Sequence, residues 1–275
     1  MVADDMGQVH GWMAKEDIRG WYRNCVNAGI HILSPQLLEK LDRPKKLDLD
    51  RGILKPLISS GSVYAYRTPE YVKDMGTPER IVQVEQDLQS SLIQQKNLSK
   101  PQRAVFLDRD GTINRYVGFL KRPEDFQLID GAAEAIRRIN QSGYLAIVVT
   151  NQPVIARGDI TWEQLEEIHR KMETLLGTEG ANLDDIFICP HHPDSGFAGE
   201  IPAYKLQCSC RKPKPGLLLQ AAEKYNIDLS QSWMIGDSQS DVDAGVAAGC
   251  QSIMLTDKLD LLGSVDLIET FRLDA

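Results

Sequence analysis

The sequence lacks the features of membrane and secreted proteins. No apolar run approaches the roughly 20 residues that a membrane-spanning helix needs, and the polar start Met1-Val-Ala-Asp-Asp is not a signal peptide. Five cysteines in 275 residues do not make a disulfide framework for a chain of this size. These absences predict a reducing compartment, with a cytoplasmic location as the default, and no membrane partner.

An excess of positive charge is also missing. Asp and Glu number 39 against 31 Lys and Arg, so the formal net charge is -8. This balance argues against a general nucleic-acid binder, although a local cluster of Arg and Lys can still bind a small phosphorylated substrate. The chain is 42% hydrophobic and 25% charged, as is usual for globular proteins, and its length predicts one or two cored domains.

The chain is organised around a short apolar run that ends in two acids. Residues 104–107 read as a buried strand, and Asp108-Arg109-Asp110-Gly111 follows as a turn signal. In an extended chain residues i and i+2 point the same way, so Asp108 and Asp110 are expected to face one substrate while Arg109 points elsewhere. One acid can then attack and the other can move a proton. The alternative is an ordinary solvated turn after a strand.

From residue 103 onward, apolar runs alternate with helical patterns. Strands are expected at 104–107, 145–149, 186–188, 233–235 and 252–255, and helices at 131–140, 162–176, 217–225 and 242–248, with Thr161 as one N-cap and Gly177 as a stop. This rhythm predicts an α/β fold with a doubly wound parallel sheet. Such sheets place ligand sites at the carboxyl ends of their strands.

Polar residues stand at those strand ends. They are Asp108 and Asp110 after the first strand, Thr150-Asn151-Gln152 after the second, Arg211-Lys212-Pro213 before a helix, and Gly236-Asp237 with Asp241 after the fourth strand. Carboxylates can hold a divalent cation and attack, while a lysine and a hydroxyl can bind phosphoryl oxygens. The combination predicts phosphoryl transfer.

A second set of residues has the spacing of a metal site. Cys189, His191, Cys208 and Cys210 form a C-x-H…C-x-C pattern that suits a tetrahedral structural Zn²⁺. Such a site would hold the loop 194–207 beside the active site. His192 is an alternative to His191, and reduced cysteines packed as small hydrophobes are the other interpretation. The remaining cysteines and histidines carry no site signal: Cys25, Cys250, His10, His31 and His169.

Residues 1–90 read as a small mixed α/β segment without a catalytic cluster. Residues 26–33 predict a strand that runs into Ser34 as N-cap of a helix over 35–41, and Tyr64-Ala-Tyr66 predicts another strand. Thr77 is expected to cap a helix that begins at Pro78 and continues through Leu88. The polar residues 91–102 read as a linker before a domain over 103–275.

The motifs of residues 103–275 resemble those of the haloacid dehalogenase superfamily of phosphohydrolases. The shared motifs are D-R-D-G-T, T-N-Q, R-K-P-K-P-G and G-D-x-x-x-D. Within it, the heptose bisphosphate phosphatase and histidinol-phosphatase group is most similar, on D-G-T-I-N, I-A-R-G at 155–158, C-P-H-H-P at 189–193 and C-x-C-R-K-P-x-P-G at 208–216. The resemblance implies a Rossmann-like phosphatase domain.

The resemblance also implies residue roles. Asp108 would form an aspartyl-phosphate, Asp110 would protonate the leaving oxygen and then activate water, Thr150 would bind the phosphoryl group, and Lys212 would balance its charge. Mg²⁺ would be held by Asp108, the Asp110 carbonyl and Asp237, while Asp241 supports the loop. Candidates for binding the substrate body or its second phosphate are Asn151, Arg157 and Arg211. The same four Cys and His residues would bind Zn²⁺.

Part of the front segment resembles the last third of a sugar-phosphate nucleotidyltransferase. V-N-A-G-I at 26–30 is similar to a sugar-binding strand of that family, and K-D-M-G-T-P-E-R at 73–80 is similar to an element whose acid, here Asp74, ligates the catalytic metal. A glycine-rich nucleotide loop is missing. We therefore expect the tail of a longer fused chain, or a remnant, and not a working transferase. The alternative is an accessory domain in which Asp74 caps a turn.

The leading hypothesis is a Mg²⁺-dependent phosphatase that removes the 7-phosphate of D-glycero-D-manno-heptose 1,7-bisphosphate. The transferase-like segment suggests a nucleotide-activated heptose pathway, a guanylyl branch with an α-anomer, and association with a nucleotidyltransferase. Two departures from the group's pattern lie near the pocket: Pro153-Val154 and Ser238. Histidinol-phosphate hydrolysis is the alternative activity, and a non-catalytic fragment that docks on a transferase is the alternative of another class.

Overall fold

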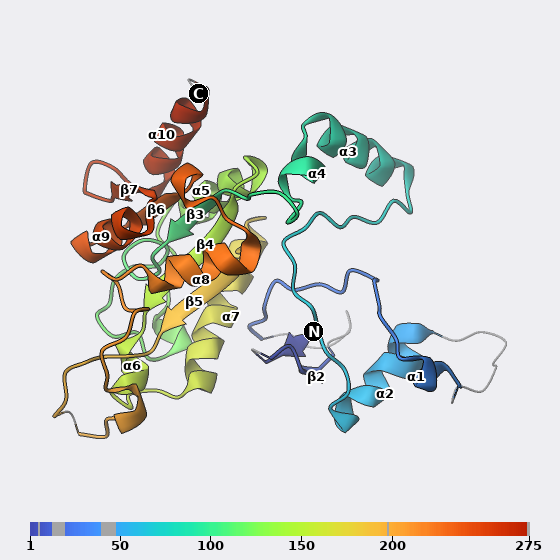
Figure 1. Ribbon diagram of the computed structural model, residues 1–275, viewed down its shortest axis with the longest axis horizontal. Helices are drawn as coiled ribbons and strands as arrows, with labels where there is room; N and C mark the ends of the chain where they lie inside the picture. The colour runs from blue at the N-terminus through green and yellow to red at the C-terminus, as the bar shows by residue number, and fades with distance from the viewer. Residues whose placement is uncertain (5, 13–19, 40–47, 197, 274–275) are drawn as a thin grey trace.

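The computed structural model describes residues 1–4, 6–12, 20–39, 48–196 and 198–273 (Figure 1). Among the described residues of the front segment, α3 is the longest element; the elements are β1 (Val2–Ala3), β2 (Val9–Gly11), α1 (Pro35–Glu39), η1 (Asp50–Leu54), α2 (Lys55–Leu57), η2 (Ile58–Ser60) and α3 (Pro78–Gln89). The short helix α4 (Leu92–Gln95) follows in the stretch predicted as a linker. β1 and β2 form a small antiparallel pair. The end of the helix expected over 35–41 lies outside the described residues.

Two strand predictions in this segment are wrong. Residues 26–33 contain no strand, and residues 64–66 make one isolated bridge, between Tyr64 and Gln8. Ile30 and Ile32 are largely exposed, so this stretch has β-branched residues but no sheet to join. The caps were predicted correctly, because Ser34 Oγ accepts a hydrogen bond from the Leu37 amide and α3 begins after the N-cap Thr77.

The second region contains the predicted parallel sheet. Its strands are β3 (Ala104–Leu107), β4 (Leu145–Asn151), β5 (Asp185–Cys189), β6 (Trp233–Gly236) and β7 (Gln251–Met254), in the order β5-β4-β3-β6-β7. All four pairings are parallel. The central strand β3 is fully buried, as its apolar sequence requires. The prediction of an α/β fold is confirmed.

Helices lie between these strands and after the last of them. They are α5 (Ala132–Gln141), α6 (Pro153–Ala156), α7 (Trp162–Thr178), α8 (Gly216–Tyr225), α9 (Gln239–Ala248) and α10 (Leu261–Leu273), with short turns η3 (Pro123–Asp125), η4 (Pro202–Tyr204) and η5 (Leu229–Gln231). Thr161 caps α7 in a capping box with Gln164, but the helix passes the expected stop at Gly177 by one residue. Among the described helices, none has both the length and the apolar character needed to cross a bilayer.

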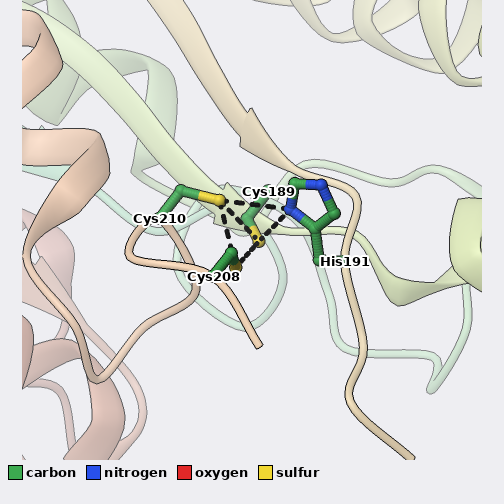
Figure 2. A group of neighbouring side chains, drawn as sticks. All are labelled: Cys189, His191, Cys208 and Cys210. Carbon is green, nitrogen blue, oxygen red and sulfur yellow. Dashed lines mark hydrogen bonds between the residues drawn. The ribbon is translucent and has the colours of Figure 1, made fainter. Parts of the chain in front are cut away.

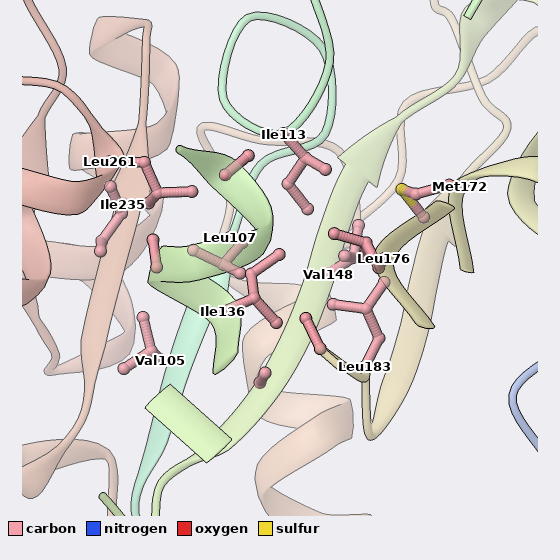
Figure 3. Packing of buried hydrophobic residues seen from close by; sticks show 14 of the residues in the cluster. Val105, Leu107, Ile113, Ile136, Val148, Met172, Leu176, Leu183, Ile235 and Leu261 are labelled. Carbon is pink, nitrogen blue, oxygen red and sulfur yellow. The ribbon is translucent and has the colours of Figure 1, made fainter. Parts of the chain in front are cut away.

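The sheet is covered on both faces. Alternate residues of its strands pack with α5, α7 and α10 on one face, where Val105, Leu107, Val148 and Ile235 are buried beside Ile136 (Figure 3). The other residues of the same strands pack with α8 and α9 on the second face. Each fully buried Leu, Ile or Val contributes about 1.5–3 kcal/mol relative to an exposed one. The two cores therefore hold the strand ends in place.

The front segment contacts this domain along α7. The Thr174 hydroxyl accepts a hydrogen bond from the Tyr22 amide at 2.8 Å. Arg23 donates from Nε to Glu166 at 2.7 Å and lies 3.2 Å from Glu173, which is almost fully buried. The helices α1 and α2 of the front segment extend away from the sheet (Figure 1). The attachment to α7 is thus polar.

The residues expected to form a linker are partly packed. Leu98 contacts the α8 and α9 core, and Gln102 is buried. The Gln102 amide donates to the Asn226 carbonyl at 2.7 Å, and the Gln102 carbonyl accepts from the Asp228 amide at 2.8 Å. The chain is therefore attached to the second region before β3 begins.

Candidate active site

Parallel pairing brings the ends of β3, β4 and β6 to one edge of the sheet. Leu107, the last residue of β3, is in register with Val148 of β4 and Ile235 of β6. The Asp108 amide then donates to the Ile235 carbonyl at 2.9 Å, so the chain leaves β3 still attached to its neighbour. The polar residues that follow these strands consequently lie together, as expected for the carboxyl edge of a parallel sheet.

Lys212 lies between two acids at this edge. Its Nζ is 2.7 Å from Asp108 Oδ1 and 2.6 Å from Asp241 Oδ1, and the lysine is buried. Burial alone would lower the pKa of Lys212, but the charges of Asp108 and Asp241 outweigh it and raise that pKa. Burial raises the pKa of Asp108 to about 6, against the opposing charge of Lys212. The lysine is therefore a fixed positive charge beside the first acid.

Asp237 completes a group of three carboxylates. One oxygen from each of Asp108, Asp237 and Asp241 lies within 4.8 Å of the others. Gly111 adopts a φ of +88°, and a Cβ there would come within 2.0 Å of Asp237 Oδ2. The backbone just after Asp110 thus approaches Asp237 as closely as only glycine allows. Oxygen donors gathered in this way fit Mg²⁺, which prefers carboxylate, carbonyl and water ligands.

Asp241 also belongs to the local structure of α9. Its Oδ2 accepts from the Ser238 amide at 3.1 Å and from the Ser238 hydroxyl at 2.6 Å, which makes a capping box with an aspartate at N3. Its other oxygen contacts Lys212. This arrangement is the one expected for a residue that supports the loop.

Asp110 is surrounded by donors. Its Oδ2 accepts from Arg109 Nη2 at 2.6 Å and from Gln152 Nε2 at 2.8 Å, while Oδ1 accepts from Asn114 Nδ2 at 3.0 Å. Burial alone would raise the pKa of Asp110, but the Arg109 charge and these hydrogen bonds outweigh it and lower the pKa. Arg109 points away from the substrate side, as expected, because its side chain is fully buried in the core. Its contact with Asp110 was not predicted. Its long side chain turns back to the carboxylate of the next residue.

The T-N-Q stretch at the end of β4 makes hydrogen bonds to other groups of the protein. Gln152 Nε2 also donates to the Thr150 hydroxyl at 2.8 Å. Asn151 makes two reciprocal hydrogen bonds with the backbone of Lys212, both of 3.1 Å. The Asn151 amide is therefore engaged with the segment that carries the lysine, and this contact helps to position Lys212.

The two candidate arginines lie on loops near this edge. Arg157 donates from Nε to Asp159 at 3.1 Å, and its guanidinium lies 4.6 Å from the centre of the Phe119 ring. Lys121 contacts the same aspartate at 2.9 Å. Arg211 donates from Nη1 to the His191 carbonyl at 3.2 Å. Both arginines are half-buried, so each keeps some exposed surface.

The four predicted zinc ligands form one cluster (Figure 2). Cys210 Sγ lies 3.2 Å from the sulfurs of both Cys189 and Cys208, and 3.3 Å from His191 Nδ1. A tetrahedron with Zn–S bonds of about 2.3 Å has sulfurs about 3.8 Å apart, so the cluster is close to that size. Cys189 is paired with Asn151 in the β4–β5 register, which places this cluster beside the catalytic edge.

The sequence alone indicated no role for Asn114, Gln152 and His169, and no contact between Arg109 and Asp110. A signal for His169 was present, because it lies four residues after Leu165 on the apolar stripe of α7, where a polar residue must be buried. Its Nε2 is 3.1 Å from Arg109 Nη1. Asn114 and Gln152 belong to recognised motifs, but no local rule shows that both would bind the same carboxylate.

Part of the chain is similar to known proteins. A family model described as "HAD-hyrolase-like" matches residues 209–258. A curated Yersinia pestis protein, D-glycero-beta-D-manno-heptose-1,7-bisphosphate 7-phosphatase, is 44% identical over 145 residues, which are 53% of this chain and 75% of that protein. The protein of the same name from Escherichia coli K12 is 42% identical over 151 residues, 55% of this chain and 77% of its own.

A solved structure has the same architecture. It is the D,D-heptose 1,7-bisphosphate phosphatase of B. bronchiseptica, determined with magnesium and phosphate. Its TM-score is 0.53 at 31% identity, covering 63% of this chain and all of that one. Fold and site thus define a HAD-like phosphatase. The chain belongs to the family of the heptose-bisphosphate phosphatases that it matches.

Proposed function

We propose that the chain hydrolyses the 7-phosphate of D-glycero-D-manno-heptose 1,7-bisphosphate through an aspartyl-phosphate on Asp108. The observation that carries this proposal is the meeting of Asp108, Lys212 and Asp237 at one sheet edge, in a chain that is 42–46% identical over 145–151 residues to phosphatases of that name. Those relatives act, by name, on the β-anomer. Their names therefore support the β-anomer here, in place of the α-anomer suggested by the transferase-like segment.

The proposed reaction has two steps. The Asp108 carboxylate attacks phosphorus as the sugar oxygen leaves, and Asp110 gives that oxygen a proton. Asp110 then takes a proton from water, which attacks phosphorus, and the bond to Asp108 breaks to release phosphate. Thr150 would bind a phosphoryl oxygen, and Lys212 would hold negative charge beside Asp108. The ionised state favoured for Asp110 suits the second step, in which it acts as a base.

Asp108, the Asp110 carbonyl and Asp237 would hold Mg²⁺, because their oxygens match its preferred donors and the turn at Gly111 brings the backbone to Asp237. When bound, the ion would neutralise charge on the phosphoryl oxygens. Arg157 and Arg211 would bind the sugar body or the 1-phosphate, since guanidinium forks match phosphate oxygens. Asn151 would act through Lys212.

The experiment that tests the proposal is phosphate release with Mg²⁺ from the two heptose bisphosphate anomers and from histidinol phosphate. Release should be fastest from the β-anomer and should disappear in Asp108→Asn. Faster release from the α-anomer would reverse the anomer assignment. Release from histidinol phosphate alone would replace the substrate while leaving the phosphatase intact.

We also propose that Cys189, His191, Cys208 and Cys210 bind a structural Zn²⁺. Four soft or borderline ligands with no open position suit that role. The purified chain should contain one zinc per molecule by elemental analysis, and Cys210→Ser should remove it. Cys250→Ser, a buried cysteine outside the cluster, is the matched control and should retain it. Full zinc content in Cys210→Ser would exclude this ligand set.

An association of residues 1–90 with a nucleotidyltransferase, and their origin as a transferase fragment, remain proposals. They rest on the motifs at 26–30 and 73–80. Size-exclusion chromatography with and without a complete sugar-phosphate nucleotidyltransferase tests the association. Unchanged elution at micromolar concentrations of both proteins would argue against it.

A further inference from the structure

The donors around Asp110 leave its two oxygens unequal. Oδ2 accepts two hydrogen bonds, from Arg109 and from Gln152, whereas Oδ1 accepts one, from Asn114. Each carboxylate oxygen has two lone-pair sites. Both sites of Oδ2 are thus occupied, and Oδ1 keeps one site open. A proton carried by this carboxyl group belongs on Oδ1.

A guanidinium only donates hydrogen bonds. Arg109 therefore determines the direction of its hydrogen bonds with Gln152 and His169. Gln152 Oε1, 3.0 Å from Arg109 Nη2, must be an acceptor, so its amide nitrogen faces Asp110. His169 Nε2, 3.1 Å from Arg109 Nη1, must also accept. The imidazole is then neutral with its proton on Nδ1. Burial, together with the Arg109 charge, lowers the pKa of His169 well below its usual value and supports this state.

Burial makes this arrangement rigid. Arg109 and His169 are 0% exposed and Gln152 is 2% exposed. A buried charge is tolerated only where it is paired and hydrogen-bonded, so the guanidinium has little freedom to adopt another orientation. Its supports come from two further elements, because Gln152 follows β4 and His169 lies on α7. The carboxylate of Asp110 is therefore oriented by the core and not by its own turn alone.

We infer that Arg109, held by His169 and Gln152, is a positioning residue that fixes the Asp110 carboxyl group so that Oδ1 carries the transferred proton. This inference rests on the proposed function, in which Asp110 is the acid and then the base. In the first step, Oδ1 gives its proton to the sugar oxygen while the bond from that oxygen to phosphorus breaks. In the second step, Oδ1 takes a proton from the attacking water while the bond from Asp108 to phosphorus breaks.

A substrate with a good leaving group separates these steps. p-Nitrophenolate leaves without a proton, so phosphorylation of Asp108 by p-nitrophenyl phosphate does not need Asp110 as an acid. Hydrolysis of the aspartyl-phosphate still needs Asp110 as a base. A variant in which Asp110 is misplaced should consequently preserve the first burst of p-nitrophenolate and slow the hydrolysis of the aspartyl-phosphate that follows. A sugar phosphate should be slowed already in the first step.

The test compares Arg109→Lys with Asp110→Asn and a matched control, all in the full chain with Mg²⁺. Lysine keeps the charge but cannot reach Asp110, Gln152 and His169 together. Arg138→Lys is the control, because Arg138 contacts Asp266 at 2.7 Å and Glu269 on α10, remote from the acids. Stopped-flow burst rates with p-nitrophenyl phosphate and single-turnover rates with heptose bisphosphate are measured for each.

For Arg109→Lys we expect a burst of one p-nitrophenolate per enzyme at a rate within about threefold of the parent, while both the steady-state rate and the sugar-phosphate rate fall at least about tenfold. Arg138→Lys should change each rate by less than about twofold. An equal fall in all three rates for Arg109→Lys, or no fall in any, would overturn the inference. If Asp110→Asn itself shows no such split, the proposed acid and base role fails instead.

His169 provides a second pair of variants in case Arg109→Lys does not fold. His169→Leu removes the acceptor of Arg109 Nη1, whereas His169→Gln retains an acceptor of similar reach. The same split between burst and sugar-phosphate rates should appear in His169→Leu and should be largely restored in His169→Gln. Identical rates in these two variants would show that the contact to Arg109 does not position Asp110.

Discussion

The two regions of the molecule differ in how their residues are held. Among the described residues before 103, the buried hydrophobic side chains are Val9, Ile53 and Leu54. The phosphatase region instead buries apolar residues on both faces of its sheet. Val26 and Ile32 of the front segment are 88% and 100% exposed. One region therefore has its own core, and the other depends on turns, short helices and contacts with α7.

This difference decides what a motif can do. The acids of the phosphatase region stand at the ends of buried strands, and neighbouring strands set their positions. Asp74, in the motif that resembles a transferase element, lies on an exposed turn, where it accepts from the Gly76 amide at 2.8 Å and contacts Arg80. The same residue type is thus held by a packed core in one region and by a local turn in the other.

The largest expected effect is the difference in activity between the Asp108 and Asp74 variants. Asp108→Asn should lower phosphate release from the best substrate by about 10⁴-fold or more, because the amide cannot act as the nucleophile. Asp74→Asn, the matched change in the front segment, should leave kcat within about twofold. Steady-state assays at equal concentrations of folded protein measure both. A large loss in Asp74→Asn would give the front segment a part in the reaction and break the comparison.

A matched pair of core variants tests the difference in packing. Ile136→Ala removes a fully buried side chain between the sheet and α5, and should cost about 2–5 kcal/mol in the free energy of unfolding. Ile53→Ala, at a buried position of the front segment, should change the unfolding midpoint of the phosphatase region by less than the error of the measurement. Urea denaturation followed by tryptophan fluorescence and by activity gives both values. Equal losses would mean one shared core.

The pH dependence of stability should have opposite signs at Asp108 and Asp87. Burial raises the Asp108 pKa to about 6, above its usual 3.8, so the metal-free chain loses stability as this group ionises between about pH 4 and pH 6. Relative to Asp108→Asn, that loss should reach at most about 3 kcal/mol in urea denaturation at pH 4.5 and 7.5. The comparison must be made without Mg²⁺.

In the front segment, the Tyr71 hydroxyl donates to Asp87 at 2.6 Å and lowers the pKa of that half-buried acid. The stabilisation from Asp87 is therefore present above its usual pKa and lost as the pH falls further. The protection of α3 amides against hydrogen exchange, relative to their intrinsic exchange rates, should fall below about pH 4 in the parent chain but not in Asp87→Asn. If lowering the pH stabilised both regions, the predicted opposite pH dependence of stability at Asp108 and Asp87 would be contradicted.

The smallest expected effect concerns the contact between the regions. Thr174→Val removes the acceptor of the Tyr22 amide and should weaken this attachment by about 1 kcal/mol. Thr178→Val, one turn later on α7, removes only a hydroxyl that donates to the Thr174 carbonyl and is the matched control. Proteolysis near residues 20–24 should accelerate in Thr174→Val, while kcat stays unchanged. A change in kcat would show that the attachment reaches the catalytic edge.

The sequence predicted the helices and strands of the phosphatase region better than those of the front segment. Buried strands and amphipathic helices were predicted where apolar periodicity is strong, as in α5, α7 and β4, because a core demands that pattern. The prediction failed at 26–33, where β-branched residues had no sheet to join. It also failed at 64–66, where the pairing with the chain beside β2 is limited to one isolated bridge. Register and strand order also could not be predicted locally, since both depend on partners far along the chain.

The sequence by itself determined which residue types stand at the strand ends, because turn signals and acids directly follow apolar runs. It thereby determined the class of chemistry. Only the tertiary structure decided how those residues are oriented. Arg109 turns back to Asp110 because Gln152 and His169, 43 and 60 positions away, accept hydrogen bonds from the same guanidinium inside the core. A buried guanidinium is oriented by the acceptors that the fold supplies, and their locations are a property of packing.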